Sequence, residues 1–145
     1  MEIWYLVADG ARARLFRASK IDGPIEETDV FVNEKGRMTD TELSDDAPGR
    51  SFKGGSRRTS MKKGDGPAEH EEKKFAKRLA DHLNDAYRDN KFERLGIVGA
   101  PKALGRIVEE LDSVVSESLI GTSSKNFTRK SRDEIQEHIS MKLLE

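Results

Sequence analysis

The sequence contains no cysteine among its 145 residues. This absence excludes disulfide scaffolds, thiolate zinc sites and cysteine catalysis. It also has no apolar run near the roughly 20 residues that a membrane-spanning helix needs. The 26 basic and 27 acidic residues nearly cancel, which excludes a uniformly basic nucleic-acid binder but not a local basic patch. The first nine residues lack the basic region of a secretory signal, so we expect a cytoplasmic protein without a membrane partner.

Apolar residues are unevenly distributed along the chain. Only five of them fall in positions 34–66, which also hold six glycines and one of the four prolines. A stretch of this composition cannot bury a core of its own. The sequence therefore predicts a single domain over residues 1–145, in which 34–66 is a long, flexible polar loop.

Three strands are predicted before this loop. Residues 3–8 form a nearly continuous apolar run that ends at Asp9-Gly10, which is typical of a strand buried on both faces. Residues 11–17 alternate in part, and residues 28–32 are rich in β-branched and aromatic side chains. The short turns between the three strands indicate an antiparallel meander.

Helices and strands alternate after the loop. Apolar residues recur at helical spacing from Pro67 to about Asp89, and a second helix follows Pro101. Residues 95–98 and 119–123 are predicted strands, and Ser131 with Glu134 has the spacing of a capping box before a last helix. The order predicts an α/β fold with a mixed sheet: antiparallel strands at the N-terminus, then a parallel crossover, flanked by helices.

The loop carries the most informative charge pattern. Between positions 50 and 63 there are six cations and no acid: Arg50, Lys53, Arg57, Arg58, Lys62 and Lys63. Such a run can grip a phosphate backbone, and Gly54-Gly55 at its centre lets a ligand approach the main chain closely. Alternatively, the loop is merely solvated and its cations balance the acids that precede it. Both interpretations stay open at this point.

No catalytic, cofactor or metal site is predicted. The three histidines, His70, His82 and His138, have no metal-binding spacing, and no glycine-flanked serine elbow occurs. Asp9 with Arg12 and Arg14 is a compact charged group near the expected core. We expect an ion pair there that steadies the first hairpin.

Several motifs, in order, resemble the bacterial family of proteins required for attachment to host cells. They are residues 8–16 (ADGARARLF), 48–52 (PGRSF), 70–71 (HE), 75–79 (FAKRL), 95–101 (LGIVGAP), 104–105 (LG) and 125–128 (KNFT). The resemblance covers essentially the whole chain. It departs at Asn126, where the family pattern has an acid, and at Gly99, where alanine is more usual.

That family in turn resembles the middle domain of archaeal and eukaryotic peptide-chain release factors, which has an RNase H-like fold. There a Gly-Gly-Gln loop precedes a long helix and enters the peptidyl-transferase centre of the ribosome. The corresponding residues here are Gly54-Gly55-Ser56, so the glutamine is absent. The resemblance thus implies the fold and an RNA-facing loop rather than peptidyl-tRNA hydrolysis.

These observations lead to three expectations about function. The first is a cytosolic RNA- or ribosome-associated module whose phosphate-binding residues are the six cations with Gly54 and Gly55. The second is a hydrolase of peptidyl-tRNA-like esters, in which the Gly-Gly N–H groups stabilise the developing charge. The third is a protein-interaction factor that influences attachment to host cells.

Overall fold

The computed structural model describes residues 1–33 and 66–144. Its five strands are β1 (Ile3–Ala8), β2 (Arg12–Ala18), β3 (Glu26–Val32), β4 (Arg94–Gly99) and β5 (Leu119–Ser123). Its helices are α4 (Pro67–Arg88), α5 (Pro101–Glu110), α6 (Ser113–Glu117) and α7 (Arg132–Lys142). Most of the elements expected from the sequence are therefore present, with boundaries that differ by one or two residues.

The strands form one sheet in the order β3-β2-β1-β4-β5. β1 pairs antiparallel with β2 and parallel with β4, β2 pairs antiparallel with β3, and β4 pairs parallel with β5. This confirms the predicted α/β class, with antiparallel strands at the N-terminus and a parallel crossover after them. Because β1, β4 and β5 run in the same direction, their carboxyl ends meet at one end of the sheet.

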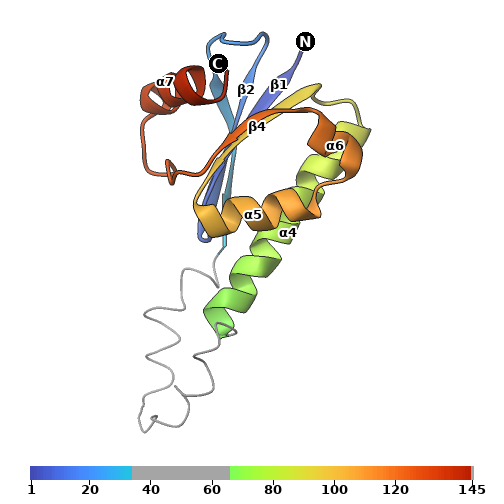
Figure 1. The fold of residues 1–145 in the computed structure, drawn as a ribbon, viewed down its shortest axis with the longest axis vertical. Helices are drawn as coiled ribbons and strands as arrows, with labels where there is room; N and C mark the ends of the chain where they lie inside the picture. Colours follow the sequence, from blue (N-terminus) through green and yellow to red (C-terminus); the bar gives the residue numbers. More distant parts are fainter. Residues whose placement is uncertain (34–65, 145) are drawn as a thin grey trace, which may run out of the picture.

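Helices cover both faces of the sheet (Figure 1). One apolar cluster joins the sheet to α4, α5 and α6 through residues such as Phe75, Ile107 and Val115. A second cluster joins the other face to α7 through Ile135, Ile139 and Leu143. α4 and α5 begin at the end of the sheet where β1 finishes (Figure 1).

Helix termini follow the local signals of the sequence. α4 and α5 each begin with a proline in their first turn, where the missing N–H is not needed. The capping box before α7 is confirmed, since the Ser131 side chain accepts from the Glu134 N–H and Glu134 reaches back to the Ser131 N–H.

Two features differ from expectation. β3 begins at Glu26, two residues before the predicted strand, because Glu26 and Glu27 lie on an exposed edge where no apolar pattern marks them. Short helix α6 was not predicted, because five residues are too few to display a helical period.

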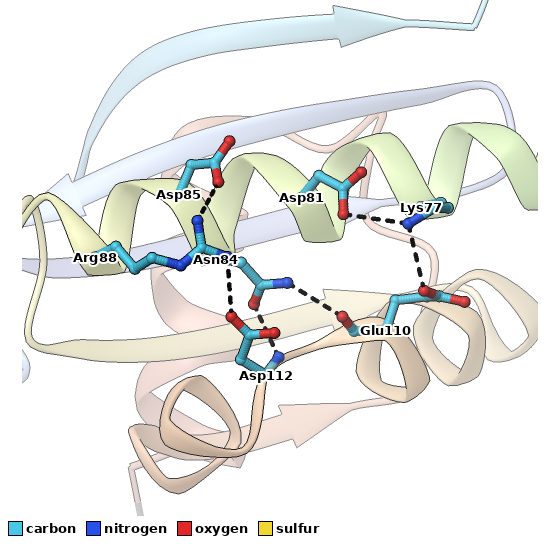
Figure 2. Close-up of polar contacts among 7 residues, drawn as sticks. All are labelled: Lys77, Asp81, Asn84, Asp85, Arg88, Glu110 and Asp112. Carbon is cyan, nitrogen blue, oxygen red and sulfur yellow. Dashed lines mark hydrogen bonds and ion pairs between the residues drawn. The ribbon is translucent and has the colours of Figure 1, made fainter.

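A polar cluster fastens α4 to the α5–α6 junction (Figure 2). The Asn84 side chain, only 5% exposed, donates to the Glu110 carbonyl at 3.2 Å and accepts from the Asp112 N–H at 2.9 Å. Arg88 bridges Asp85 and Asp112 closer to solvent. These contacts fix α5 against α4, which sets the position of the amino end of α5.

Candidate functional site

Asp9 lies directly after β1 and closes the turn into β2. Its Oδ1 accepts hydrogen bonds from the Ala11 N–H at 2.7 Å and the Arg12 N–H at 2.8 Å. In the described part of the chain no ion pair joins Asp9 to Arg12 or Arg14, so the expected ion pair is wrong. The carboxylate steadies the hairpin through the main chain instead, because those two N–H groups lie nearer than any guanidinium.

The second oxygen of Asp9 holds the segment that follows β5. Oδ2 accepts from the Thr128 hydroxyl at 2.8 Å and from Asn126 Nδ2 at 3.1 Å. Thr128, which is 3% exposed, also donates its N–H to Asn126 Oδ1 at 3.1 Å, and its hydroxyl oxygen lies 2.8 Å from the same atom. Asp9, Asn126 and Thr128 therefore form a closed polar unit that connects the ends of β1 and β5.

The pKa of Asp9 is lowered from its ordinary value. Burial acts to raise this pKa, but the hydrogen bonds from Ala11, Thr128, Arg12 and Asn126 to the carboxylate outweigh that effect. Asp9 is accordingly ionised across the neutral range, and its charge is distributed over four donors.

A pocket of about 330 Å³ opens beside Asp9, at the carboxyl ends of β1 and β4. Open α/β sheets place their ligands in such crevices. Its polar lining consists of Asp9, Glu72, Lys102, Arg106 and Asn126, above small and apolar side chains of α4 and α5. We call this cavity the Asp9 pocket.

The cations of the Asp9 pocket are already paired with acids of α4. Arg106 forms ion pairs with Glu69 and with Glu72, and Lys102 lies 3.7 Å from Glu69. Burial acts to raise the pKa of Glu69, but Arg106 and Lys102 outweigh this effect and hold the pKa below its ordinary value. Counting the described residues alone, the acids Asp9, Glu69 and Glu72 outnumber the cations Lys102 and Arg106, so these side chains offer no surplus of positive charge to a phosphate.

Glycine at position 10 leaves room for the Glu72 side chain of α4. A Cβ at position 10 would lie 2.7 Å from Cδ of Glu72, so any larger residue would require that side chain to move. The Asp9-Gly10 turn signal therefore also allows packing between two elements that are distant in sequence.

Asn33 directly follows β3 and is the last described residue before position 66. Its N–H donates to the Ala11 carbonyl at 2.9 Å, and its Nδ2 donates to the carbonyls of Gly10 at 3.0 Å and Glu71 at 3.2 Å. This buried side chain thus ties the end of β3 to the Asp9 turn and to the second turn of α4. Residue 33 before the segment and α4 after it are held together beside the Asp9 pocket.

The predicted phosphate-binding residues all lie outside the described residues. They are Arg50, Lys53, Gly54, Gly55, Arg57, Arg58, Lys62 and Lys63. Of the polar stretch predicted over 34–66, only Gly66 is described, as the residue that precedes α4. What the structure adds is the position at which both ends of this segment are held.

Sequence reasoning missed the residues that build the described part of the site. Asn33 was not singled out, Thr128 appeared only within the motif 125–128, and Asn126 was noted only as a departure from that motif. Asp9 and Asn126 are 117 positions apart, and no spacing rule connects residues across such a distance. A polar residue at the end of a strand was the only available signal.

The histidines form no catalytic arrangement in the described residues. The Ser123 hydroxyl lies 2.8 Å from Nε2 of His138, but no described carboxylate orients that ring, which stacks on Phe127 instead. The pKa of His138 is lowered, mainly by burial and then by the positive charges of Lys142 and Lys125. This contact fastens α7 to the end of β5.

Within residues 1–33 and 66–144, no three His, Asp or Glu side chains gather in a way that could hold a metal ion. In the same part of the chain, no helix has both the length and the apolarity to cross a membrane.

Comparison with protein families gives one match. The model of the family described as "Protein required for attachment to host cells" matches residues 4–139. A search of curated proteins found no match.

Solved structures similar to this chain include two crystal structures from Aquifex aeolicus. The type II variant of the Ppx/GppA phosphatase has 13% sequence identity and a TM-score of 0.41. A structure of the Aquifex member of the Ppx/GppA protein family has 14% identity and a TM-score of 0.42. In both cases the match covers 84% of this chain and 35% of the other, so the chain spans about a third of the length of these structures.

Proposed function

This chain belongs to the family of proteins required for attachment to host cells, and from that premise we propose that it is an RNA-binding module that associates with the ribosome through its basic segment. The family description names a phenotype and not a chemical activity. A regulator that acts on RNA can produce such a phenotype indirectly. The proposal therefore concerns what the molecule binds.

The observation that carries the proposal is the run of six cations without an acid between positions 50 and 63. Lysine and arginine release counterions when they neutralise phosphates, and this term supplies most of the affinity of non-specific nucleic-acid binding. Phe52 is the one aromatic residue in the run, and stacking on bases is therefore a minor contribution. We expect contacts to the backbone with little preference for sequence.

The attachment of the segment supports the same proposal. Asn33 and α4, the described residues on either side of positions 34–65, lie beside each other next to the Asp9 turn. The resemblance to a release-factor middle domain, where a glycine-rich loop precedes a long helix, points to the ribosome as the source of the RNA.

Sedimentation of ribosomes in sucrose gradients tests the proposal. Wild-type protein is compared with a variant in which all six cations are alanine, at low and at high salt. We expect wild-type protein to move with ribosomes at low salt, to be released at high salt, and to lose the association in the variant. Wild-type protein that stays at the top of the gradient at both salts contradicts ribosome association.

The two other functions expected from the sequence are separate outcomes of further assays. Release of the amino acid from a charged tRNA, abolished by Gly55→Pro, would indicate an ester hydrolase in place of a binding module. Association that survives both high salt and the loss of the six cations would indicate a protein partner.

A further inference from the structure

A second basic site lies on the α7 side of the sheet. It is a pocket of about 370 Å³, which we call the arginine pocket, and it is lined by Arg12, Arg14, Val30, Val32, Thr128 and Arg129. Arg12 pairs with Val32 and Arg14 with Val30 across β2 and β3. Side chains two positions apart on a strand share a face, so both arginines lie on the face that carries Phe16 and packs against α7.

α7 does not cover this end of the face. Phe16 and Ala18 of β2 are buried in the apolar cluster under α7, whereas Arg12 and Arg14 on the same face are only half-buried. Val30 is 61% exposed, although it lies in a strand. The floor of the arginine pocket is therefore apolar and accessible, and its rim is cationic.

Arg14 organises the pocket and is itself fully engaged. Its Nε and Nη2 donate to the two oxygens of Glu27 at 2.9 Å and 3.1 Å. Its Nη1 donates to the carbonyls of Thr128 at 3.2 Å and Lys130 at 2.7 Å. These two carbonyls flank Arg129, so Arg14 fixes the main chain from which the Arg129 side chain projects.

Arg12 and Arg129 have no such partners. In the part of the chain that the structure describes, neither guanidinium forms a hydrogen bond or an ion pair. Arg129 is exposed and Arg12 is half-buried. The Asp9 carboxylate, which lies nearby, is already satisfied by four donors and binds Arg12 through its main chain only.

We propose that Arg12 and Arg129 form a second phosphate-binding site, which takes the backbone of the same RNA strand that the segment 50–63 binds. Two unpaired guanidinium groups on a fixed backbone match the charge and the geometry of phosphates. The exposed Val30 and the half-buried Val32 beside them offer apolar surface to sugar edges. The inference rests on the proposed function, and it adds residues that belong to the described part of the chain.

The position of the pocket supports a shared strand. Val32 lines the arginine pocket and Asn33, the next residue, is where the chain leaves the sheet toward the basic segment. The Asp9 pocket lies at the same end of the sheet, but its cations are neutralised by Glu69 and Glu72. Arg12 and Arg129 thus offer unpaired guanidinium groups beside the residue at which the described chain leaves the sheet.

The test measures fluorescence anisotropy of a short labelled single-stranded RNA titrated with full-length protein. Four proteins are compared: wild type, R12A/R129A, the variant with six alanines in segment 50–63, and the control K20A/K91A. Lys20 and Lys91 are exposed and lie at the other end of the sheet, near the Ile3–Ala18 and Ile3–Arg94 pairs, so the control removes the same charge. Thermal melts of all four establish that they fold.

We expect R12A/R129A to bind the RNA about tenfold more weakly than wild type. The slope of log K against log salt should also become shallower by about 1.4, because two phosphate contacts are lost and each contact with a single strand contributes roughly 0.7. The control should match wild type within about twofold. Millimolar inorganic phosphate should compete poorly, because a free anion makes only one of the contacts of a strand. Strong competition by phosphate would instead identify a site for a small anion and overturn the assignment to RNA.

The remaining outcomes separate this inference from the proposed function. If the six-alanine variant loses binding while R12A/R129A behaves like the control, the arginine pocket is not a phosphate site and the proposed function stands. If R12A/R129A loses binding while the six-alanine variant does not, the pocket binds RNA and segment 50–63 does not. If wild-type protein does not bind the RNA, both the proposed function and the assignment of the arginine pocket are wrong.

Discussion

Exchanging Asp9 and Asn126 tests how the end of β1 is held to the segment after β5. In Asp9→Asn, Oδ1 still accepts from the N–H groups of Ala11 and Arg12, but the new amide nitrogen faces Nδ2 of Asn126, and two donors oppose each other. In Asn126→Asp, two carboxylates face each other. The double variant D9N/N126D restores a donor opposite an acceptor.

The magnitudes follow from these contacts. A hydrogen bond to a charged group contributes about 1.5–3 kcal/mol, and Asp9→Asn weakens two of them. We therefore expect each single variant to lower the free energy of unfolding by about 2 kcal/mol, or roughly 4–8 °C in Tm. Because the double variant regains the pairing, it should be more stable than the sum of the singles predicts by about 1–2 kcal/mol.

Urea denaturation of the four proteins at neutral pH measures this coupling. A coupling below about 0.5 kcal/mol would show that the two residues act independently and would refute the reasoning. The pH dependence gives a second readout. Because the folded pKa of Asp9 is lowered, its stabilisation is present above the unfolded value of about 3.9 and is lost as pH falls through the folded pKa. Asp9→Asn should therefore flatten the acid limb of the stability curve.

Three further predictions concern the scaffold. Asn84→Ala leaves the Glu110 carbonyl and the Asp112 N–H unsatisfied, and we expect it to lower the free energy of unfolding in urea by about 2 kcal/mol (Figure 2). Arg88→Ala removes only exposed ion pairs and should lower it by less than about 1 kcal/mol. Equal losses of stability in the two variants would contradict this expectation. Gly96→Ala places a Cβ 2.7 Å from Tyr5 Cδ1 and should lower Tm by an amount equivalent to about 1–3 kcal/mol. Gly105→Ala adds a methyl group in open space on α5 and should raise Tm. A change of Tm in the same direction for both variants would contradict the packing described above. The pKa of His138 is lower in the folded than in the unfolded protein, so stability should fall as pH drops below about 6.5, the unfolded pKa, toward the folded pKa. His138→Gln should make this fall in stability shallower. Urea midpoints with the same pH dependence in the variant and in wild-type protein would contradict this.

Local signals in the sequence predicted most of the fold. β1 has its predicted bounds, because an apolar run that ends at Asp-Gly determines both the strand and its turn. Pro67 and Ser131 mark two helix starts for reasons that depend only on nearby residues. α6 was missed because five residues show no period.

The site was much less predictable, because it depends on contacts between distant positions. The sequence shows that Asp9 follows a strand, but not that Thr128 and Asn126 supply donors to it from the far end of the chain. The expected ion pair with Arg14 is wrong because that arginine binds Glu27 of β3 and two carbonyls after β5. The composition of segment 50–63 predicted a phosphate-binding region, and the described residues show only where that segment is attached.

The salt dependence of RNA binding tests the central claim most directly. In filter binding between about 50 and 200 mM salt, the six phosphate contacts of segment 50–63 contribute about −4 to −5 to the slope of log K against log salt in wild-type protein. The variant with alanine at Arg50, Lys53, Arg57, Arg58, Lys62 and Lys63 should lose most of that slope. A wild-type slope near zero, or the same slope in both proteins, would contradict RNA binding through the basic segment.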